Sequence, residues 1–588
     1  ELTGRAQLGH QAGGVWDEWY AAFKDGRWGW LAEAQGRFYI TFEVSLPPDE
    51  GKLPAFDEIQ IGQAVTSIPG AVAMVAAETG EARALGAKGE IPYRLVPGQT
   101  YFYADLSGPH GEFATIDYGD GERNLYMGRE VQLAELGFAA SVHAPEHETR
   151  HAGGVQLNCP KCGGPMDLRA PDKTERVTCP NCGSLLDVNQ GGLVFLKALE
   201  RGRVVPVIPI GTTGDIAGGK YTVIGFMQRS VEFSGVRYHW EEYLLYNPQL
   251  GFRWLVRSDE QWNFVETVSP GQVKASAKYA TFNNRHFRIY QDTVARVDYV
   301  SGEFYWKVTL GELVRASDFV HPPFMLSREI SVTEAQRLEG HGGEHSGTHR
   351  THETGEINWS LGTYVTPKTV EKAFGISGLP KPGKPAPNQE FPHKKVYSYW
   401  GLTMLVALVL GLIVGTAAPE RTVFQQTYTL EPLANGSATQ TIFTDPIQLK
   451  SSLNIQVTAT ASIDNSWLFV DGDFYDNSNG LTQAYELPVE YYYGSDSDGP
   501  WREGSPSASA HISALPSGSY VMRMEIQWEH WNSPMNMTVR VEQGVARTSH
   551  LGFTLLALSI LPFLVLIQHY VFSVRRWADS EFTPFKGG

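Results

Sequence analysis

The chain has 588 residues, a formal net charge of -16 and many aromatic side chains, among them 15 Trp and 26 Tyr. This length exceeds what a single hydrophobic core supports and predicts several domains. The acidic balance argues against nucleic acid as a partner, because phosphate backbones are bound by clustered Lys and Arg. The aromatic content favours packed β-structure over disorder or long coiled helices.

The first predicted domain covers residues 1–142 and consists of short segments rich in aromatic and β-branched residues. Turn signals such as Asp25-Gly26 separate these segments, which is typical of hairpins in a β-barrel or β-sandwich. The chain opens on "ELTGRAQLGH", with neither a Met nor a charged and apolar leader. We therefore expect the N-terminal part of this domain to precede Glu1.

A short segment after the first domain, "HETRH", matches the HExxH pattern of zinc hydrolases. On a helix, this spacing would place His147 and His151 on one face to bind zinc, with Glu148 as general base. The flanking Pro145 and Gly153 and the lack of an apolar helical stripe favour a solvated linker instead. A membrane-bound zinc-dependent hydrolase that uses this segment is the alternative hypothesis for function.

All four cysteines lie in a predicted zinc ribbon, residues 155–190, as two CxxC pairs separated by sixteen residues. Each Cys-Pro-x-Cys-Gly is expected to form a tight turn with a positive φ at its glycine, and two such turns complete a tetrahedral Zn²⁺ site. The spacing favours zinc over an iron–sulfur cluster or a redox dithiol. We expect a structural or protein-docking module in a reducing compartment, with these ligands: Cys159, Cys162, Cys179 and Cys182.

A second predicted repeat domain covers residues 195–333. Its sequence aligns with that of the first domain, although the two domains differ in length. "WDEWYAAFKDGRWGWL", from Trp16, aligns with "WEEYLLYNPQLGFRWL", from Trp240, and the intervening stretch is eleven residues shorter in the second copy. The chain is therefore expected to contain a duplicated domain. The aligned pairs are Trp16/Trp240, Glu18/Glu242, Trp30/Trp254, Leu31/Leu255, Phe38/Trp262, Gly89/Gly302, Glu90/Glu303, Gly98/Gly311 and Asp105/Asp318.

The segments "GTTGDIAGGKYTVIGF", "WEEYLLYNPQLGFRWL" and "YVSGEFYWKVTLGE" resemble the bacterial family of domains of unknown function numbered 4178, and both copies carry the resemblance. The family has no established activity, so the resemblance supplies no catalytic residue. It implies a setting near polyamine-synthesis or envelope-stress genes.

The carboxylates shared by the two copies could form acid/base pairs. Positions kept in both copies of a repeat usually reflect shared geometry. A solvated strand face or a turn hydrogen bond is therefore the preferred interpretation, and no catalytic or cofactor-binding residue is assigned.

Residues 334–396 are predicted to be a His/Gly- and Pro-rich linker with a short helix that begins near Pro367. Its four clustered histidines could bind a transition metal, but the Gly-rich, unpatterned setting favours a flexible loop. These histidines are His341, His345, His349 and His352.

Two uncharged runs, residues 399–418 and 551–572, are long enough to cross a bilayer as helices. Basic residues precede the first run and follow the second, whereas the segment between them has few. The positive-inside rule then places both termini, including the tail 573–588, in the cytoplasm. The cysteines fall on the same side, as a reducing compartment requires.

Residues 420–548 alternate polar and apolar positions in short runs broken by Gly, Asn, Asp and Ser. This pattern predicts an extracytoplasmic β-sandwich. Its excess of carboxylates over basic residues disfavours docking to anionic lipid.

Together these features predict a mostly β, multidomain protein with two β-barrel or sandwich-like repeats, a zinc ribbon, two transmembrane helices and an extracytoplasmic β-sandwich. We expect a non-enzymatic adaptor or sensor in a bacterial inner membrane that links the external domain to cytoplasmic protein partners. Phosphate-loop, GxSxG and dinucleotide motifs are absent from the sequence. A homo-oligomer is left open, and a substrate-binding subunit with an aromatic-lined pocket is a further alternative.

Overall fold

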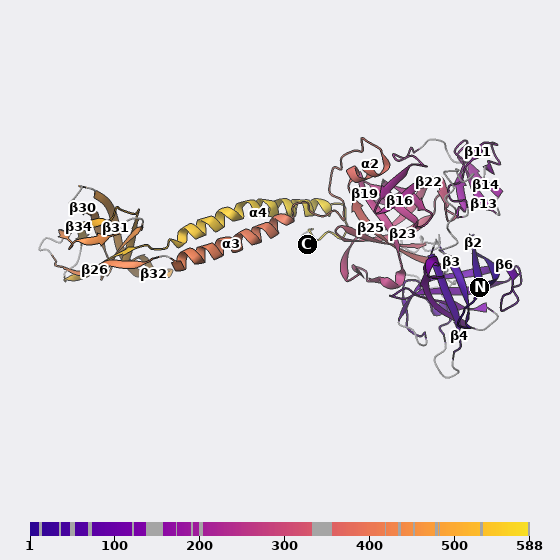
Figure 1. Ribbon diagram of the computed structural model, residues 1–588, viewed down its shortest axis with the longest axis horizontal. Helices are drawn as coiled ribbons and strands as arrows, with labels where there is room; N and C mark the ends of the chain where they lie inside the picture. The colour runs from indigo at the N-terminus through magenta and orange to yellow at the C-terminus, as the bar shows by residue number, and fades with distance from the viewer. Residues whose placement is uncertain are drawn as a thin grey trace. The chain divides into compact units, whose positions relative to one another are not determined.

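The computed structural model divides the chain into two units (Figure 1), Glu1–Phe391 with Tyr570–Gly588, and Pro392–His569. The residues it describes are 1–585 except the following: 11–13, 35–36, 47–52, 69–72, 120–122, 137–156, 172, 190–191, 199–203, 234, 332–354, 418, 433–436, 451–452, 477–479, 481 and 530–532.

The first unit contains two closed barrels of eight antiparallel strands. In the first barrel the strand order is β1-β2-β3-β4-β9-β8-β7-β6, and β6 pairs with β1 to close the ring. Closure leaves no unpaired sheet edge. The strands are β1 (Leu2–His10), β2 (Gly14–Ala22), β3 (Trp28–Ala34), β4 (Arg37–Val44), β6 (Met74–Gly89), β7 (Thr100–Ser107), β8 (Glu112–Asp117) and β9 (Asn124–Val131), with the short β5 (Ala64–Val65) paired to β6.

The second barrel has the order β16-β17-β18-β19-β25-β24-β23-β22, and β22 closes it against β16. Strand for strand, this is the topology of the first barrel. Its strands are β16 (Gly219–Phe233), β17 (Val236–Asn247), β18 (Gly251–Ser258), β19 (Gln261–Val268), β22 (Arg285–Phe304), β23 (Leu313–His321), β24 (Phe324–Ser331) and β25 (Gly355–Val365). Short strands flank it: β15 (Thr213–Ile216), β20 (Lys274–Ala275) and β21 (Tyr279–Phe282).

Two close glycine contacts occur at matching places in the barrels. Gly4 pairs with Gly89, and Gly225 pairs with Gly302. Gly89 has φ 76° and Gly302 φ 88°, and a Cβ on either would lie 2.3 Å from a backbone oxygen of the neighbouring strand. Only glycine fits there without a backbone shift, which explains why both copies place it at the same point.

The register irregularities also match. The β1–β6 register shifts between Gln7 and Leu8, and the β16–β22 register shifts between Gln228 and Arg229. A second shift lies between Ala76 and Glu78 in β6 and between Ile289 and Gln291 in β22. Because bulges bend and twist a strand at a defined point, the two barrels share local geometry as well as strand order.

The second barrel extends beyond the predicted boundary at residue 333. Its eighth strand, β25 (Gly355–Val365), lies in the segment that the sequence assigned to the linker, and it pairs with both β19 and β24. In the sequence, the His/Gly-rich insertion separates this strand from the rest of its domain. A domain boundary drawn where the strand pattern stops therefore leaves the strand out. The helix α2 (Pro367–Phe374) follows directly, with Thr366 as its N-cap.

A small subdomain of short strands joins the second barrel. It contains β10 (Leu157–Asn158), β11 (Pro165–Met166), β12 (Arg176–Thr178), β13 (Ser184–Asn189) and β14 (Gly192–Ala198). β12 pairs with β22, so the subdomain continues the hydrogen-bonding of the barrel. Two of its buried residues, Ala170 and Leu185, pack with the apolar cluster of the second barrel that contains Phe304.

The second unit contains a two-sheet β-sandwich, which in the sequence lies between two apolar helices. The end of the second helix belongs to the first unit. One sheet has the order β26-β35-β29-β33 and the other β27-β34-β30-β31-β32, with β28 on β34. Side chains from both sheets form one apolar core. The strands are β26 (Arg421–Leu430), β27 (Ser437–Phe443), β28 (Ile447–Leu449), β29 (Ile455–Ala461), β30 (Ser466–Asp476), β31 (Thr482–Asp496), β32 (Gly499–Ser505), β33 (Ser507–Ile512), β34 (Gly518–Glu529) and β35 (Met535–Gln543).

The two helices are α3 (Lys395–Ala417) and α4 (Thr548–Arg576), of 23 and 29 residues. Both are long and apolar enough to cross a membrane, with mean hydropathies of 2.1 and 2.2 over 18 residues. Their side chains are almost entirely exposed in the structure. Such a surface is unfavourable in water and suits a lipid environment.

Candidate functional site

The four cysteines converge, and their sulfur atoms all lie within 4.8 Å of one another. Cys159 and Cys182 are 3.6 Å apart, and Cys162 and Cys179 are 3.8 Å apart, as measured between Sγ atoms. These separations are too long for disulfides. Four thiolates at about 2.3 Å from a central ion would lie about 3.8 Å apart, so the donor set fits a tetrahedral metal site.

Each cysteine pair sits on the predicted tight turn. The Gly163 amide donates to the Cys159 carbonyl and the Gly183 amide to the Cys179 carbonyl, both at 2.8 Å. The φ angles of these glycines are 69° and 66°, as the sequence predicts. Burial raises the pKa of the Cys179 thiol to about 12. A bound cation would oppose this shift by stabilising the thiolate.

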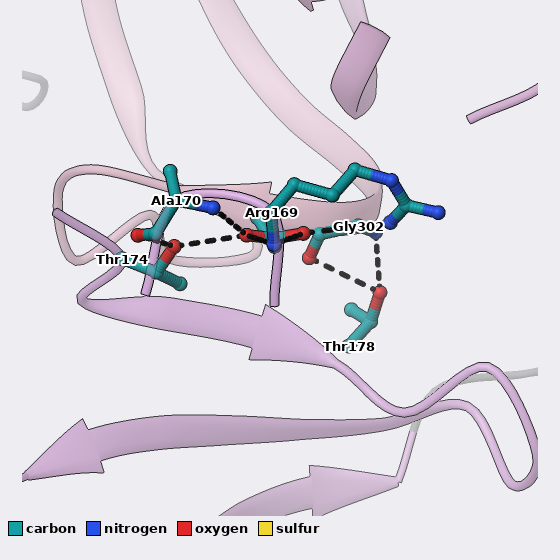
Figure 2. A network of polar contacts seen from close by, with 6 residues as sticks. Arg169, Ala170, Thr174, Thr178 and Gly302 are labelled. Atoms are coloured by element: carbon teal, nitrogen blue, oxygen red, sulfur yellow. Dashed lines mark hydrogen bonds and ion pairs between the residues drawn. The ribbon is translucent and has the colours of Figure 1, made fainter. Parts of the chain in front are cut away.

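A buried carboxylate fastens the cysteine subdomain to the second barrel (Figure 2). Glu303 of β22 is 2% exposed and accepts hydrogen bonds from the Arg169 amide at 2.8 Å and the Ala170 amide at 3.0 Å. The Thr174 hydroxyl also donates to it, at 3.1 Å. Next to it, the Gly302 amide donates to the Thr178 hydroxyl. A carboxylate with this many donors is strongly stabilised in its place.

For Glu303 and Glu242, the structure corrects the prediction that the shared carboxylates lie on a solvated strand face or form a turn hydrogen bond. Glu303 and Glu242 are 2% and 9% exposed, whereas Glu90, the equivalent of Glu303, is exposed. The sequence pattern could not reveal this, because the subdomain that covers Glu303 has no counterpart on the described part of the first barrel.

The second barrel holds an ion-pair cluster in its interior. The Arg229 guanidinium of β16 lies 3.2 Å from Glu242 of β17 and 2.6 Å from Glu329 of β24. β16 and β24 are not neighbours, so these side chains meet across the barrel. The Trp240 indole donates to Glu242 at 2.6 Å, and Ser327 donates to Asp318 at 2.6 Å.

Equivalent carboxylates face the interior of the first barrel. The Trp16 indole donates to Glu18 at 3.0 Å, and Thr115 donates to Asp105 at 2.7 Å. Burial, and then the charge of Glu78, raise the pKa of Asp105 well above its usual range; Glu18 adds to this shift. Trp16 and Tyr103 stand two positions from Glu18 and Asp105 on the same strand faces, and their ring centroids are 5.9 Å apart although β2 and β7 are not neighbours. Both carboxylates therefore point inward.

A His–carboxylate–Tyr group lies beside this pair. The His10 Nε2 atom is 3.2 Å from Glu78, and the Tyr103 hydroxyl donates to the same carboxylate. The hydrogen bond to Glu78 raises the pKa of His10, so the two groups form an ion pair when His10 is protonated. This pairing compensates the charge of Glu78, whereas burial favours the protonated forms of Glu18 and Asp105.

The two histidine motifs cannot be placed. His147, Glu148 and His151 lie outside the described residues, as do the four histidines between residues 341 and 352. The four cysteines are the only group of three or more metal-ligating side chains that converges within the described part of the chain.

Two buried side chains with long-range contacts, Arg229 and Trp577, were missed by sequence reasoning. Arg229 is a single basic residue in the apolar run "VIGFMQRSVEF", which is the available signal for an interior charge. Trp577, 6% exposed, packs with Tyr290 and Val320 of the second barrel and follows the second apolar helix. A lone aromatic residue after a membrane-like helix gives no sequence signal of where it docks.

Residues 209–367, which contain the second barrel, match the family described as "Domain of unknown function (DUF4178)". The match covers about a quarter of the chain. It confirms the resemblance for this barrel, whereas membership of the first barrel and a bacterial origin stay predictions. Among curated proteins, none matches the chain.

Some solved structures show a weak similarity. PNGF-II is 8% identical, with 55% of this chain and 68% of that chain covered and a TM-score of 0.14. A structure from infectious bursal disease virus Gx strain is 8% identical, with 64% and 69% covered and a TM-score of 0.14. A Bacillus subtilis arabinoxylan arabinofuranohydrolase of glycoside hydrolase family 43 is 7% identical, with 91% and 93% covered and a TM-score of 0.12. These scores support no shared fold.

Proposed function

We propose that the protein is a non-enzymatic sensor or adaptor of a bacterial inner membrane, which couples the external sandwich to a cytoplasmic protein partner. Both termini would be cytoplasmic, because basic residues flank the apolar helices on that side. The observation that carries the proposal is the attachment of both chain segments next to the helices to one barrel. An envelope-stress or polyamine-linked setting is the role that the family resemblance implies.

The segment before α3 is attached by a buried amide. Asn388 is 0% exposed, and its side chain donates to the Asn263 side chain at 2.7 Å and to the Pro323 carbonyl at 3.1 Å. Both partners belong to the wall of the second barrel or its adjoining turn. A displacement of the helix would therefore pull on a fixed point of the barrel.

The segment after α4 docks on the same barrel. The Tyr290 hydroxyl of β22 donates to the Arg576 carbonyl at 3.2 Å, and the Ser580 hydroxyl donates to the Tyr290 carbonyl. Trp577 packs against Tyr290, and the Arg288 guanidinium lies 5.5 Å from the Trp577 ring centroid. These buried contacts supply the rigid link that a relay requires.

We propose a structural Zn²⁺ at the four cysteines. The tetrahedral donor set supports zinc, and a bound ion would add folding energy to a subdomain with a small core of its own. Through Glu303 the subdomain would hold the end of β22, the strand that also contacts the segment after α4. No observation among the described residues favours the hydrolase alternative.

The test compares cytoplasmic partners of tagged chains in gently solubilised membranes. The variants are the intact chain, a chain with residues 420–548 replaced by a Gly-Ser linker, and Trp577→Ala. Trp501→Ala removes an exposed aromatic side chain of the sandwich and is the matched control. Membrane insertion is checked for each variant.

We expect a cytoplasmic protein to copurify with the intact chain and its yield to change about threefold or more in the linker-replaced chain and in Trp577→Ala, but not in Trp501→Ala. A sensor requires this dependence on the external domain and on the attachment of α4. Failure to recover a cytoplasmic protein contradicts the proposal, and so does a yield that is insensitive to both changes, since the helices would then be simple anchors.

A further inference from the structure

A cation in the second barrel has no counterpart at the same position of the first. Arg229 pairs with Trp240 across β16 and β17, and Leu8 pairs with the equivalent Trp16 across β1 and β2. Arg229 and Leu8 therefore occupy the same position. Glu242 contacts the Arg229 guanidinium, whereas the residue at the position of Arg229 in the first barrel, Leu8, is apolar and buried.

The neighbouring charged groups that shift the pKa values of the interior carboxylates Glu18 and Asp105 are themselves carboxylates. Burial raises the pKa of Glu18, and Asp117 raises it further. Burial and the carboxylates of Glu78, Glu18 and Glu356 raise the pKa of Asp105. Within the described residues, no Lys or Arg forms an ion pair with Glu18 or Asp105, whereas both Glu242 and Asp318 feel the charge of an arginine in the second barrel.

Aromatic rings line the same interior. The Trp16 and Tyr103 ring centroids are 5.9 Å apart although their strands, β2 and β7, are not neighbours. Burial and nearby carboxylates, Glu18 among them, raise the pKa values of Tyr101 and Tyr126. Trp16, Tyr101 and Tyr126 are only half-buried. Aromatic faces attract organic cations, most strongly where water is partly excluded.

The arrangement fits an organic cation better than a metal ion. A metal ion needs several ligand atoms converging on one point. Within the described residues only the four cysteines bring three or more such atoms within 4.8 Å of one another. The carboxylates of the first barrel are spread around the ring, with aromatic side chains among them, and an organic cation can contact both kinds of group.

We propose that the interior of the first barrel binds a small organic cation with a guanidinium or primary ammonium group, which takes the place of the Arg229 guanidinium in the second barrel. Glu18 and Asp105 accept its hydrogen bonds and supply the compensating charge. Trp16 and the neighbouring tyrosines contact its faces and its alkyl part. The second barrel, which carries its own cation, does not bind such a ligand.

The test titrates the full chain in detergent micelles with n-butylguanidinium and with n-butylammonium, followed by calorimetry and tryptophan fluorescence. Glu18→Gln and Asp105→Asn remove the charges at nearly constant shape. Leu8→Arg introduces the guanidinium of the second barrel as an internal competitor. Asp17→Asn is the matched control, because Asp17 precedes Glu18 on β2 and pairs with Arg5, 2.9 Å away, on the outer face. Butanol and sodium chloride control for apolar and ionic effects.

We expect saturable binding of at least one organic cation, with affinity about tenfold weaker in Glu18→Gln and in Asp105→Asn, lost in Leu8→Arg, and changed less than about twofold in Asp17→Asn. Thermal unfolding checks that each variant is folded. Absence of saturable binding by the unmodified chain overturns the proposal, as does unchanged binding in folded Leu8→Arg. Binding of Mg²⁺ or Ca²⁺ without binding of either organic cation also overturns it.

Discussion

The two barrels have the same strand order, the same two register shifts and the same close glycine contact, yet their charged side chains have different surroundings. In the second barrel, Arg229 pairs with interior carboxylates, and the cysteine subdomain covers Glu303. In the first barrel, Leu8 replaces the arginine and Glu90 is exposed. Backbone sterics therefore maintain the frame. In the second barrel a cation pairs with the interior carboxylates, whereas among the described residues no Lys or Arg forms an ion pair with Glu18 or Asp105 of the first barrel.

The largest expected effect comes from Arg229→Leu, which gives the second barrel the residue of the first. Glu242 and Glu329 would lose their cation, and an isolated buried charge costs about 3–5 kcal/mol. Hydrogen exchange of the β16 and β17 amides in the full chain measures this loss locally.

The double variant Arg229→Leu/Glu242→Gln is the control for that measurement. It also removes the unpaired negative charge of Glu242 and should recover part of the lost protection of the β16 and β17 amides from hydrogen exchange. If Arg229→Leu lowers the protection of these amides from hydrogen exchange by less than about 1 kcal/mol, solvent stabilises the charge of Glu242 without the arginine. The two barrels would then not differ in how their interior charges are stabilised.

A smaller loss of stability is expected at Glu303, which the cysteine subdomain covers in the second barrel, and at its exposed equivalent Glu90 in the first barrel. Glu303→Gln should cost about 2 kcal/mol of local stability, because two backbone amides lose a charged acceptor; Glu90→Gln should cost less than about 0.5 kcal/mol. Limited proteolysis of residues 157–198 and zinc stoichiometry follow the change.

Glu303→Gln should keep one zinc per chain and expose the cysteine subdomain to protease, whereas Cys159→Ser/Cys162→Ser should lose the zinc itself. His147→Ala/His151→Ala should leave the stoichiometry unchanged. A second zinc that disappears with the histidines would instead revive the hydrolase hypothesis. Equal protease sensitivity of Glu303→Gln and the unmodified chain would show that β12–β22 pairing alone holds the subdomain.

Much of this frame is predictable from sequence, because it depends on local rules. Aligned tryptophans and glycines indicated the repeat, CxxC spacing indicated the cysteine cluster, and uncharged runs indicated α3 and α4. Each signal is either periodic or confined to a few neighbouring residues. A Cys-Pro-x-Cys-Gly turn, for example, needs only its own five residues to orient two thiols.

The rest depends on contacts between residues far apart in the chain. Whether Glu303 is solvated is decided by Arg169 and Ala170, more than 130 residues earlier. The role of Arg229 depends on Glu329, 100 residues later, and β25 follows a long insertion. Alternation along a strand shows that two faces differ, but in a barrel with a polar interior it does not show which face is inside.

The last prediction compares the pH dependence of Asp318 and Asp105. Burial is the main cause that raises the pKa of Asp318, from 3.8 to about 6, and Arg229 partly opposes it. A raised carboxyl pKa means that the folded state holds its proton longer than the unfolded state. Stability is therefore lost as pH rises from about 4 to about 6, by roughly 1–3 kcal/mol, and regained on acidification.

Asp318→Asn removes this titration, so the difference in unfolding temperature between the variant and the unmodified chain should change between pH 7 and pH 5. Asp105→Asn should show the same change at higher pH, because among the described residues no arginine forms an ion pair with Asp105 that would oppose the shift. Thermal unfolding followed by tryptophan fluorescence from pH 4 to pH 8 measures both windows without added ligand. If the Asp105 window coincides with that of Asp318 or lies below it, the first barrel already contains a compensating cation, and the contrast that motivates its ligand is lost.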